Sequence, residues 1–100
     1  MKLQLITPEK ILFEGDIASV QIPGTEGDFG VLPGHAPFVS GLRAGVVAIE
    51  AANGAVHTML VVGGLAEVNP DHTLLLAEKA VSVASMSDAE IAQKLAELQA

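Results

Sequence analysis

The chain has 100 residues, of which half are hydrophobic, and a formal net charge of −7. This length suits one domain with a single core, and the core must be aliphatic because the sequence has three Phe and no Trp or Tyr. Five Lys and Arg residues are too few for a nucleic-acid surface, which depends on cationic contacts to phosphate, and the absence of Cys excludes disulfides and thiolate chemistry.

The first quarter of the chain predicts three short strands. Residues 2–6 alternate between apolar and polar side chains, which is typical of a half-buried strand. Further strands are predicted at residues 11–14 and 17–22, with a turn at Gly15-Asp16 between them. Pro23 is expected to end the third strand, because proline has no N–H to donate to a ladder.

A long connection follows at residues 24–37, GTEGDFGVLPGHAP. It holds four of the ten glycines and two of the five prolines in the chain. Connections of this length without regular structure are uncommon and are more often functional or disordered. Because it also carries Leu, Val and Phe, we expect a packed loop.

The second half predicts more strands, joined by clear turn signals. Asn53-Gly54 between two apolar runs is a strong hairpin signal, and Asn69-Pro70-Asp71 marks another turn. The predicted strands are 38–42, 44–52, 55–62, 65–68, 72–77 and 79–84. Turns at intervals of about 8–12 residues are typical of an antiparallel sandwich or barrel, here with eight to ten strands.

The hydrophobic period becomes helical near the C-terminus. Residues 87–90, Ser-Asp-Ala-Glu, form a capping box, and an apolar stripe follows at Ile91, Leu95 and Leu98. Glu90 and Lys94 have the spacing of a favourable i, i+4 pair. We therefore expect a β-sandwich domain at residues 1–84 and a short helix at 85–100, the first helix of an incomplete hairpin.

No stretch of the sequence predicts direct membrane insertion. The start, MKLQLITPEK, lacks the apolar segment of a secretory signal. The longest apolar run, residues 59–66, contains two glycines and is far shorter than the roughly 20 residues that a membrane helix needs.

Catalytic patterns are weak. The spacing of Gly24, Gly27 and Gly30 lacks the helix and Lys of a phosphate-binding loop, so these glycines are better explained as turn residues. Glu26 and Asp28 would need a cleft and a companion nucleophile or metal to act as an acid/base pair, whereas exposed acids suit a basic or polar partner surface.

The three histidines leave two hypotheses open. His35 lies between Gly34 and Ala36-Pro37, where it could bond backbone carbonyls or contact a partner. The alternative function is a β-barrel, metal-dependent isomerase or lyase, which would use His35, His57 and His72 with Glu67 or Glu78.

Residues 23–47, PGTEGDFGVLPGHAPFVSGLRAGVV, closely resemble the ε subunit of bacterial and chloroplast F-type ATP synthase and its mitochondrial δ counterpart. In that family a Gly-Glu-Gly-type turn is followed by Gly-x-x-Pro-Gly-His-Ala-Pro, here residues 30–37, and by a Pro-Gly or Ala-Gly turn, here 44–45. The opening at residues 5–15 and the segment 62–68, VGGLAEV, are also similar. The likeness spans about residues 3–84 in order.

The resemblance implies a flattened, ten-stranded antiparallel β-sandwich followed by C-terminal helices, in a subunit that is not an enzyme and needs no cofactor or metal. It implies a place in the central stalk, between the γ subunit and the polar loops of the membrane c-ring. The F1 α/β assembly would be a further partner. The implied location is peripheral, on the cytoplasmic face of the bacterial inner membrane.

Site residues carry over by position. Glu26, Asp28 and Phe29 would face the c-ring, and Thr7, His35 and Ser40 would lie toward γ. Asp28 stands where the family usually has Glu, so its side chain is one methylene shorter. Family members usually have two C-terminal helices, whereas residues 85–100 predict one, with a single Lys and no Arg. We therefore expect no ATP binding, and weak or no inhibition of ATP hydrolysis.

Overall fold

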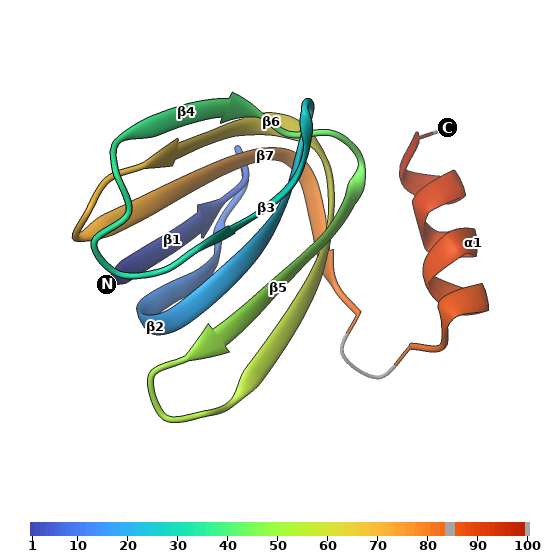
Figure 1. Ribbon diagram of the computed structural model, residues 1–100. Helices are drawn as coiled ribbons and strands as arrows, with labels where there is room; N and C mark the ends of the chain where they lie inside the picture. Colours follow the sequence, from blue (N-terminus) through green and yellow to red (C-terminus); the bar gives the residue numbers. More distant parts are fainter. Residues whose placement is uncertain (84–85, 100) are drawn as a thin grey trace.

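The strands of the computed structural model form one curved sheet, and a helix lies beside it (Figure 1). The structure describes residues 1–83 and 86–99. Within that part the sheet has seven strands in the order β1-β7-β6-β5-β2-β3, with β4 paired to β6. Because β1 also pairs with β2, the sheet closes on itself around one core.

The strands are β1 (Lys2–Ile6), β2 (Ile11–Gly24), β3 (Gly27–Val31), β4 (Phe38–Gly41), β5 (Gly45–Ala51), β6 (Val56–Val68) and β7 (His72–Ser82). The helix α1 covers Asp88–Gln99. The mainly β class with one C-terminal helix is confirmed. The expected count of ten strands is too high, and the β1–β7 pair is parallel rather than antiparallel.

The predicted turn at Gly15-Asp16 is wrong, because β2 runs through it as one strand of 14 residues. Its first half pairs with β1, where Gly15 is opposite Leu3, and its second half pairs with β3 and β5. Pro23 does not end the strand either. It pairs with Asp28 on β3, and its carbonyl accepts a hydrogen bond from the Arg43 N–H at 3.0 Å.

Two other predicted breaks are absorbed into longer strands. Gly63 and Gly64 lie inside β6 with positive φ values of 67° and 128°, so the strand bends there without ending. A side chain at Gly64 has no room, because its Cβ would be 1.9 Å from the Leu76 carbonyl oxygen. On the partner strand, β7 continues through the predicted break at Glu78.

Alternating aliphatic side chains fill the core. The fully buried members come from β1, β2, β3, β5, β6 and β7, so every strand except β4 contributes. They include Leu5, Val20, Val31, Val47, Ile49, Val61 and Leu75. On most of these strands the side chains one position away face outward, as the period of two requires. On β6, however, Leu60 next to Val61 is also buried.

The helix begins as the capping box predicts. The Glu90 N–H donates to the Ser87 hydroxyl at 3.3 Å, and the Ser87 N–H donates to the Glu90 carboxylate at 3.5 Å. Because that carboxylate is used by the cap, Lys94 lies 3.6 Å from Glu97 instead of pairing with Glu90. The predicted boundary between residues 84 and 85, and residue 100, lie outside the described residues. Over its described length the helix is too short and too polar to cross a membrane.

Candidate functional site

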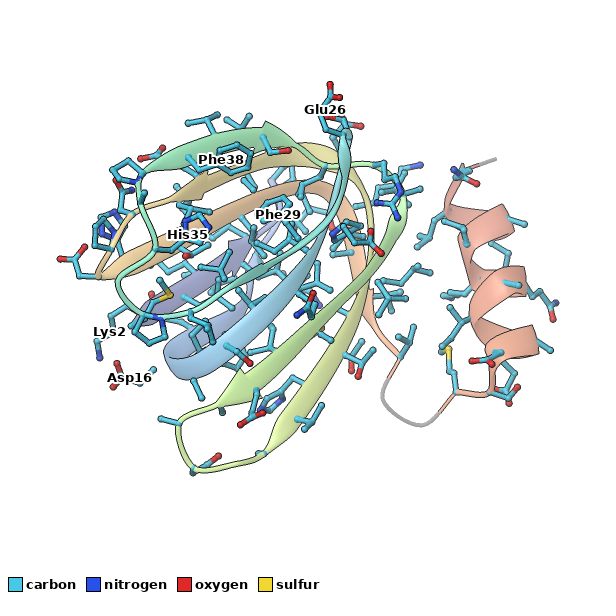
Figure 2. All side chains as sticks on the ribbon, viewed as in Figure 1. Lys2, Asp16, Glu26, Phe29, His35 and Phe38 are labelled. Carbon is cyan, nitrogen blue, oxygen red and sulfur yellow. The ribbon has the colours of Figure 1, made fainter. Side chains whose placement is uncertain are left out.

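The first half of the predicted loop is a β-hairpin. Residues 24–31 were expected to lack regular structure, but β3 pairs with the end of β2. The pairing runs from Gly24 opposite Gly27 to Val20 opposite Val31. Gly27 has a φ of 127°, which a residue with a side chain rarely adopts, and this allows the tight turn at Thr25-Glu26. Figure 2 shows Glu26 at the tip of this hairpin, projecting away from the sheet.

Backbone hydrogen bonds join the hairpin to the connection between β4 and β5. The Thr25 N–H donates to the Gly41 carbonyl at 3.0 Å, and Gly24 forms an isolated bridge with Leu42. The approach is close, since a Cβ on Gly24 would lie 2.8 Å from both the Gly27 carbonyl oxygen and the Phe29 ring. The hairpin therefore has a fixed position on the sandwich.

Side chains add two further contacts. The Phe29 ring packs edge-to-face on Phe38, with centroids 5.2 Å apart and an interplanar angle of 85° (Figure 2). The Arg43 guanidinium donates to the Gly24 carbonyl at 3.1 Å and forms an ion pair with Asp28. The three residues predicted to face the c-ring thus lie on one hairpin, but their surroundings differ.

The structure does not gather the residues predicted to lie toward γ. Thr7 closes the β1–β2 turn, where its hydroxyl accepts a hydrogen bond from the Lys10 N–H at 3.3 Å. Ser40 is buried and donates to the Gly41 carbonyl at 2.9 Å. His35 follows Gly34, whose N–H donates to the Pro70 carbonyl at the β6–β7 turn.

The distance between Thr7 and His35 follows from the register. Ile6, next to Thr7, pairs with Leu76 on β7, which is six residues beyond Pro70. Six residues of strand span about 20 Å, so His35 and Thr7 lie toward opposite ends of the sheet. The His35 ring nitrogen Nδ1 is 2.7 Å from the Ala36 carbonyl oxygen, as the hypothesis of local backbone bonding expects.

A patch of apolar side chains lies on the outward face of β4, β6, β7 and β1. Leu65, Leu76 and Ile6 are neighbours across three strands, since Leu65 pairs with Leu76 and Leu76 with Ile6. Val39 lies on the same face, opposite Glu67. Leu65 and Leu76 are 41% and 42% exposed, and Val39 is 63% exposed. We call these four residues, Ile6, Val39, Leu65 and Leu76, the outer patch.

Two shallow grooves border the outer patch. One, of about 350 Å³, is lined by Ile6, Thr7, Pro8, Leu76, Ala77 and Glu78. The other, of about 610 Å³, lies nearer the β6–β7 turn and is lined by Lys2, Leu3, Gln4, Glu14, Gly15, Glu67, His72, Thr73 and Leu74. Sequence reasoning missed the outer patch, because alternation shows which residues share a face but not which strands lie side by side.

The histidines do not form a metal site. His57 packs on the Phe13 ring, with centroids 5.1 Å apart, and His72 contacts Asp71 through Nδ1 at 2.8 Å. That hydrogen bond is the main reason that the pKa of Asp71 lies below its ordinary value of 3.8. Among residues 1–83 and 86–99, no group of three or more His, Asp or Glu side chains could hold a metal ion. The isomerase or lyase alternative is not supported.

Residues 1–83 match the family model of the ATP synthase delta/epsilon chain, β-sandwich domain. The chain is 43% identical over 96 residues to the ATP synthase epsilon chain 1 of Nitrobacter hamburgensis, covering 96% of this chain and 70% of the relative. It is 44% identical over 98 residues to the ATP synthase epsilon chain of Rhodopseudomonas palustris, covering 98% and 72%.

Solved structures agree in fold. A chain of the Euglena gracilis mitochondrial ATP synthase, described as OSCP/F1/c-ring in rotational state 1, superposes with a TM-score of 0.79 at 26% identity. The superposition covers 97% of this chain and 62% of that chain. A chain from the central stalk/c-ring of the Tetrahymena thermophila mitochondrial ATP synthase gives a TM-score of 0.66 at 17% identity, covering 99% and 90%, which is a likeness of fold alone.

The family resemblance expected from the sequence is thereby confirmed. The matched region contains the whole closed sheet, including the hairpin, the outer patch and the connection that carries Arg43. The chain belongs to the ATP synthase delta/epsilon family, whose members are accessory subunits rather than catalytic ones.

Proposed function

We propose that this chain is a subunit of the ATP synthase central stalk that joins the γ subunit to the polar loops of the c-ring. In this role it transmits rotation between the ring and the F1 α/β assembly, and it performs no chemistry itself. It would work peripherally, at the cytoplasmic face of a bacterial inner membrane. The family match and the names of the relatives support this proposal.

The observation that carries the proposal is the outer patch. A subunit that links two partners needs two separate surfaces on one stiff body. Neighbouring exposed aliphatic side chains on a sheet face mark an interaction surface, and here they lie on β6, β7, β1 and β4. The hairpin tip provides the second surface, with Glu26 exposed at its end.

We assign the outer patch to γ and the hairpin tip to the c-ring. Thr7 borders the patch through the groove it shares with Ile6 and Leu76. Ser40 is buried, so it would affect a γ contact indirectly, by fixing the conformation of β4. A γ contact that reached both Thr7 and His35 would have to cover about 20 Å of this face.

The test is retention of the purified γ subunit by the immobilised chain, with Leu65→Glu/Leu76→Glu as the disrupting variant. Burying the exposed part of two leucines is worth on the order of 1–2 kcal/mol, and the introduced carboxylates add a cost of desolvation. We therefore expect at least a tenfold loss of affinity.

The matched control is Val56→Glu, because Val56 is 66% exposed at the far end of β6, outside the outer patch. It should leave retention of γ unchanged. If the wild-type chain does not retain γ, or if the Leu65/Leu76 variant binds as well as the wild type, the proposed function is wrong.

A further inference from the structure

The two acids of the hairpin differ in what surrounds them. Asp28 lies on β3 and forms an ion pair with Arg43, with side-chain exposures of 66% and 45%. Glu26 lies at the turn, two residues earlier, and is exposed. Among the residues that the structure describes, Glu26 has neither an ion pair nor a side-chain hydrogen bond.

Arg43 contacts both strands of the hairpin. One guanidinium nitrogen, Nη1, donates to the Gly24 carbonyl at the end of β2, and the other, Nη2, contacts the Asp28 carboxylate on β3. The planar, forked guanidinium suits such a two-point contact, whereas the single ammonium of a lysine does not reproduce it. Arg43 therefore connects the hairpin to the β4–β5 connection by its side chain as well as by its backbone.

The backbone places Arg43 for this role. Its N–H donates to the Pro23 carbonyl at 3.0 Å, and the Thr25 N–H donates to the Gly41 carbonyl at 3.0 Å. The guanidinium thus extends from a fixed point beside the hairpin. An exposed ion pair adds little to the stability of the whole fold, so we expect this one to act locally, on how firmly and in which direction the hairpin is held.

A cationic partner surface would meet these two acids differently. At Asp28 it would have to displace Arg43, and its own positive charge would then lie beside the guanidinium. Like charges placed together at an interface are unfavourable and exclude such contacts. At Glu26 no internal cation has to be displaced, and Figure 2 shows this side chain at the outermost point of the hairpin.

We propose that Arg43 is a positioning residue that binds Asp28 within the chain, so that Glu26 presents the free carboxylate to a positively charged partner loop. Under this proposal the charged contact with the c-ring is made by Glu26 and not by Asp28, to which the resemblance also gives that role. The identity of the partner rests on the proposed function, whereas the internal role of Arg43 does not.

A charge-swap cycle tests the proposal. The variants are Asp28→Arg, Arg43→Asp and the double swap, with Glu26→Gln as the fourth, and the readout is the affinity for a detergent-solubilised γ–c-ring complex at low and high salt. Asp28→Arg should weaken binding at least tenfold, because two unpaired cations then face the partner, and the double swap should restore binding to within about threefold, because the internal pair is re-formed. Arg43→Asp loses the positioning contact but leaves no cation beside the partner, so it should weaken binding less than Asp28→Arg. Glu26→Gln should weaken binding about tenfold and reduce its dependence on salt.

The opposite pattern would overturn the proposal. If Asp28 contacts the partner directly, the double swap binds as weakly as Asp28→Arg, because position 28 still carries the wrong charge. Glu26→Gln would then bind with wild-type affinity and wild-type salt dependence.

A second readout uses the free chain, so the proposal can fail independently of the partner. The Thr25 N–H bonds to Gly41 across the hairpin junction, and its hydrogen exchange reports how firmly the hairpin is held. Arg43→Gln should accelerate this exchange several-fold, Arg43→Lys should do so less, and the double swap should restore the wild-type rate. Unchanged exchange in Arg43→Gln would refute the positioning role even if binding is lost. A wild-type chain that binds no γ–c-ring complex would refute the proposed function and the partner of Glu26.

Discussion

The hairpin and the helix α1 are both exposed, but they are held to the sandwich in different ways. The hairpin is joined to residues 38–43 by backbone hydrogen bonds, by the edge-to-face contact of Phe29 with Phe38, and by the Arg43 side chain. In α1 no residue of 88–99 is buried. Lys79 Nζ on β7 donates a hydrogen bond to the Leu98 carbonyl at 2.8 Å, which joins the helix to the sheet.

This difference separates a fixed element from a peripheral one. The hairpin cannot move without breaking backbone bonds to the sheet, so it can hold a charge at a defined point. The helix has a capped start, a half-buried stripe at Ile91, Leu95 and Leu98, and contacts with β6, but none of residues 88–99 is fully buried. Segments with little buried apolar contact open at low free energy, independently of the core. We therefore expect α1 to unfold locally while the sandwich stays intact.

The largest effect is expected from Gly24→Ala at the hairpin junction. The new Cβ would be 2.8 Å from the Gly27 carbonyl oxygen and from the Phe29 ring, so the backbone must shift. Overpacking of this kind costs about 1–3 kcal/mol, which lowers Tm by roughly 5–20 °C in a domain of this size. Thermal and urea unfolding measure the change.

Gly15→Ala on the same strand is the matched control, because the nearest atom to its Cβ would be 3.9 Å away. It should change the free energy of unfolding by less than about 0.5 kcal/mol. Equal stability of the Gly24→Ala and Gly15→Ala variants would mean that the hairpin is not held as closely as we describe.

A smaller and strictly local effect is expected from Ser87→Ala, which removes the cap of α1. Losing an N-cap costs about 1 kcal/mol of helix stability, or roughly a fivefold increase in hydrogen exchange of the α1 amides. The Tm of the sandwich should stay within about 2 °C of the wild-type value. Ser82→Ala, at an exposed position on β7, is the control for loss of a hydroxyl. A clear drop in sandwich stability with Ser87→Ala would show that helix and sheet unfold together.

The features that the sequence predicted are local ones. The capping box at residues 87–90 and the Asn53-Gly54 turn need only neighbouring residues to form, and both occur as expected. The aliphatic core follows from alternation within each strand. The assignment to a family rested on motifs spread over residues 3–84, which are specific as a set.

The features that it did not predict depend on which strands meet. Gly15-Asp16 has the composition of a turn, but pairing with β1 keeps it extended. The first half of residues 24–37 forms a hairpin because β2 continues past Pro23 and offers a partner strand. The pairing of Asp28 with Arg43 joins residues 15 positions apart and becomes visible only when the hairpin lies on the β4–β5 connection.

The smallest effect is expected at the β6–β7 turn. The Pro70 carbonyl in this turn accepts a hydrogen bond from the Gly34 N–H, in the loop before His35. The His72 side chain donates a hydrogen bond to Asp71 and lowers the pKa of that carboxyl below 3.8. A lowered pKa in the folded state means that the contribution of this hydrogen bond to stability is present above about pH 3.8 and is lost as the pH falls through the folded pKa.

Asp71→Asn should therefore lower Tm at pH 5–7 and leave it unchanged near pH 2. The decrease should be slight, because Asp71 is fully exposed. Thermal unfolding of both proteins across this range measures the difference, and His72→Gln should give the same pattern. A Tm difference that grows toward low pH would contradict the sign of the effect.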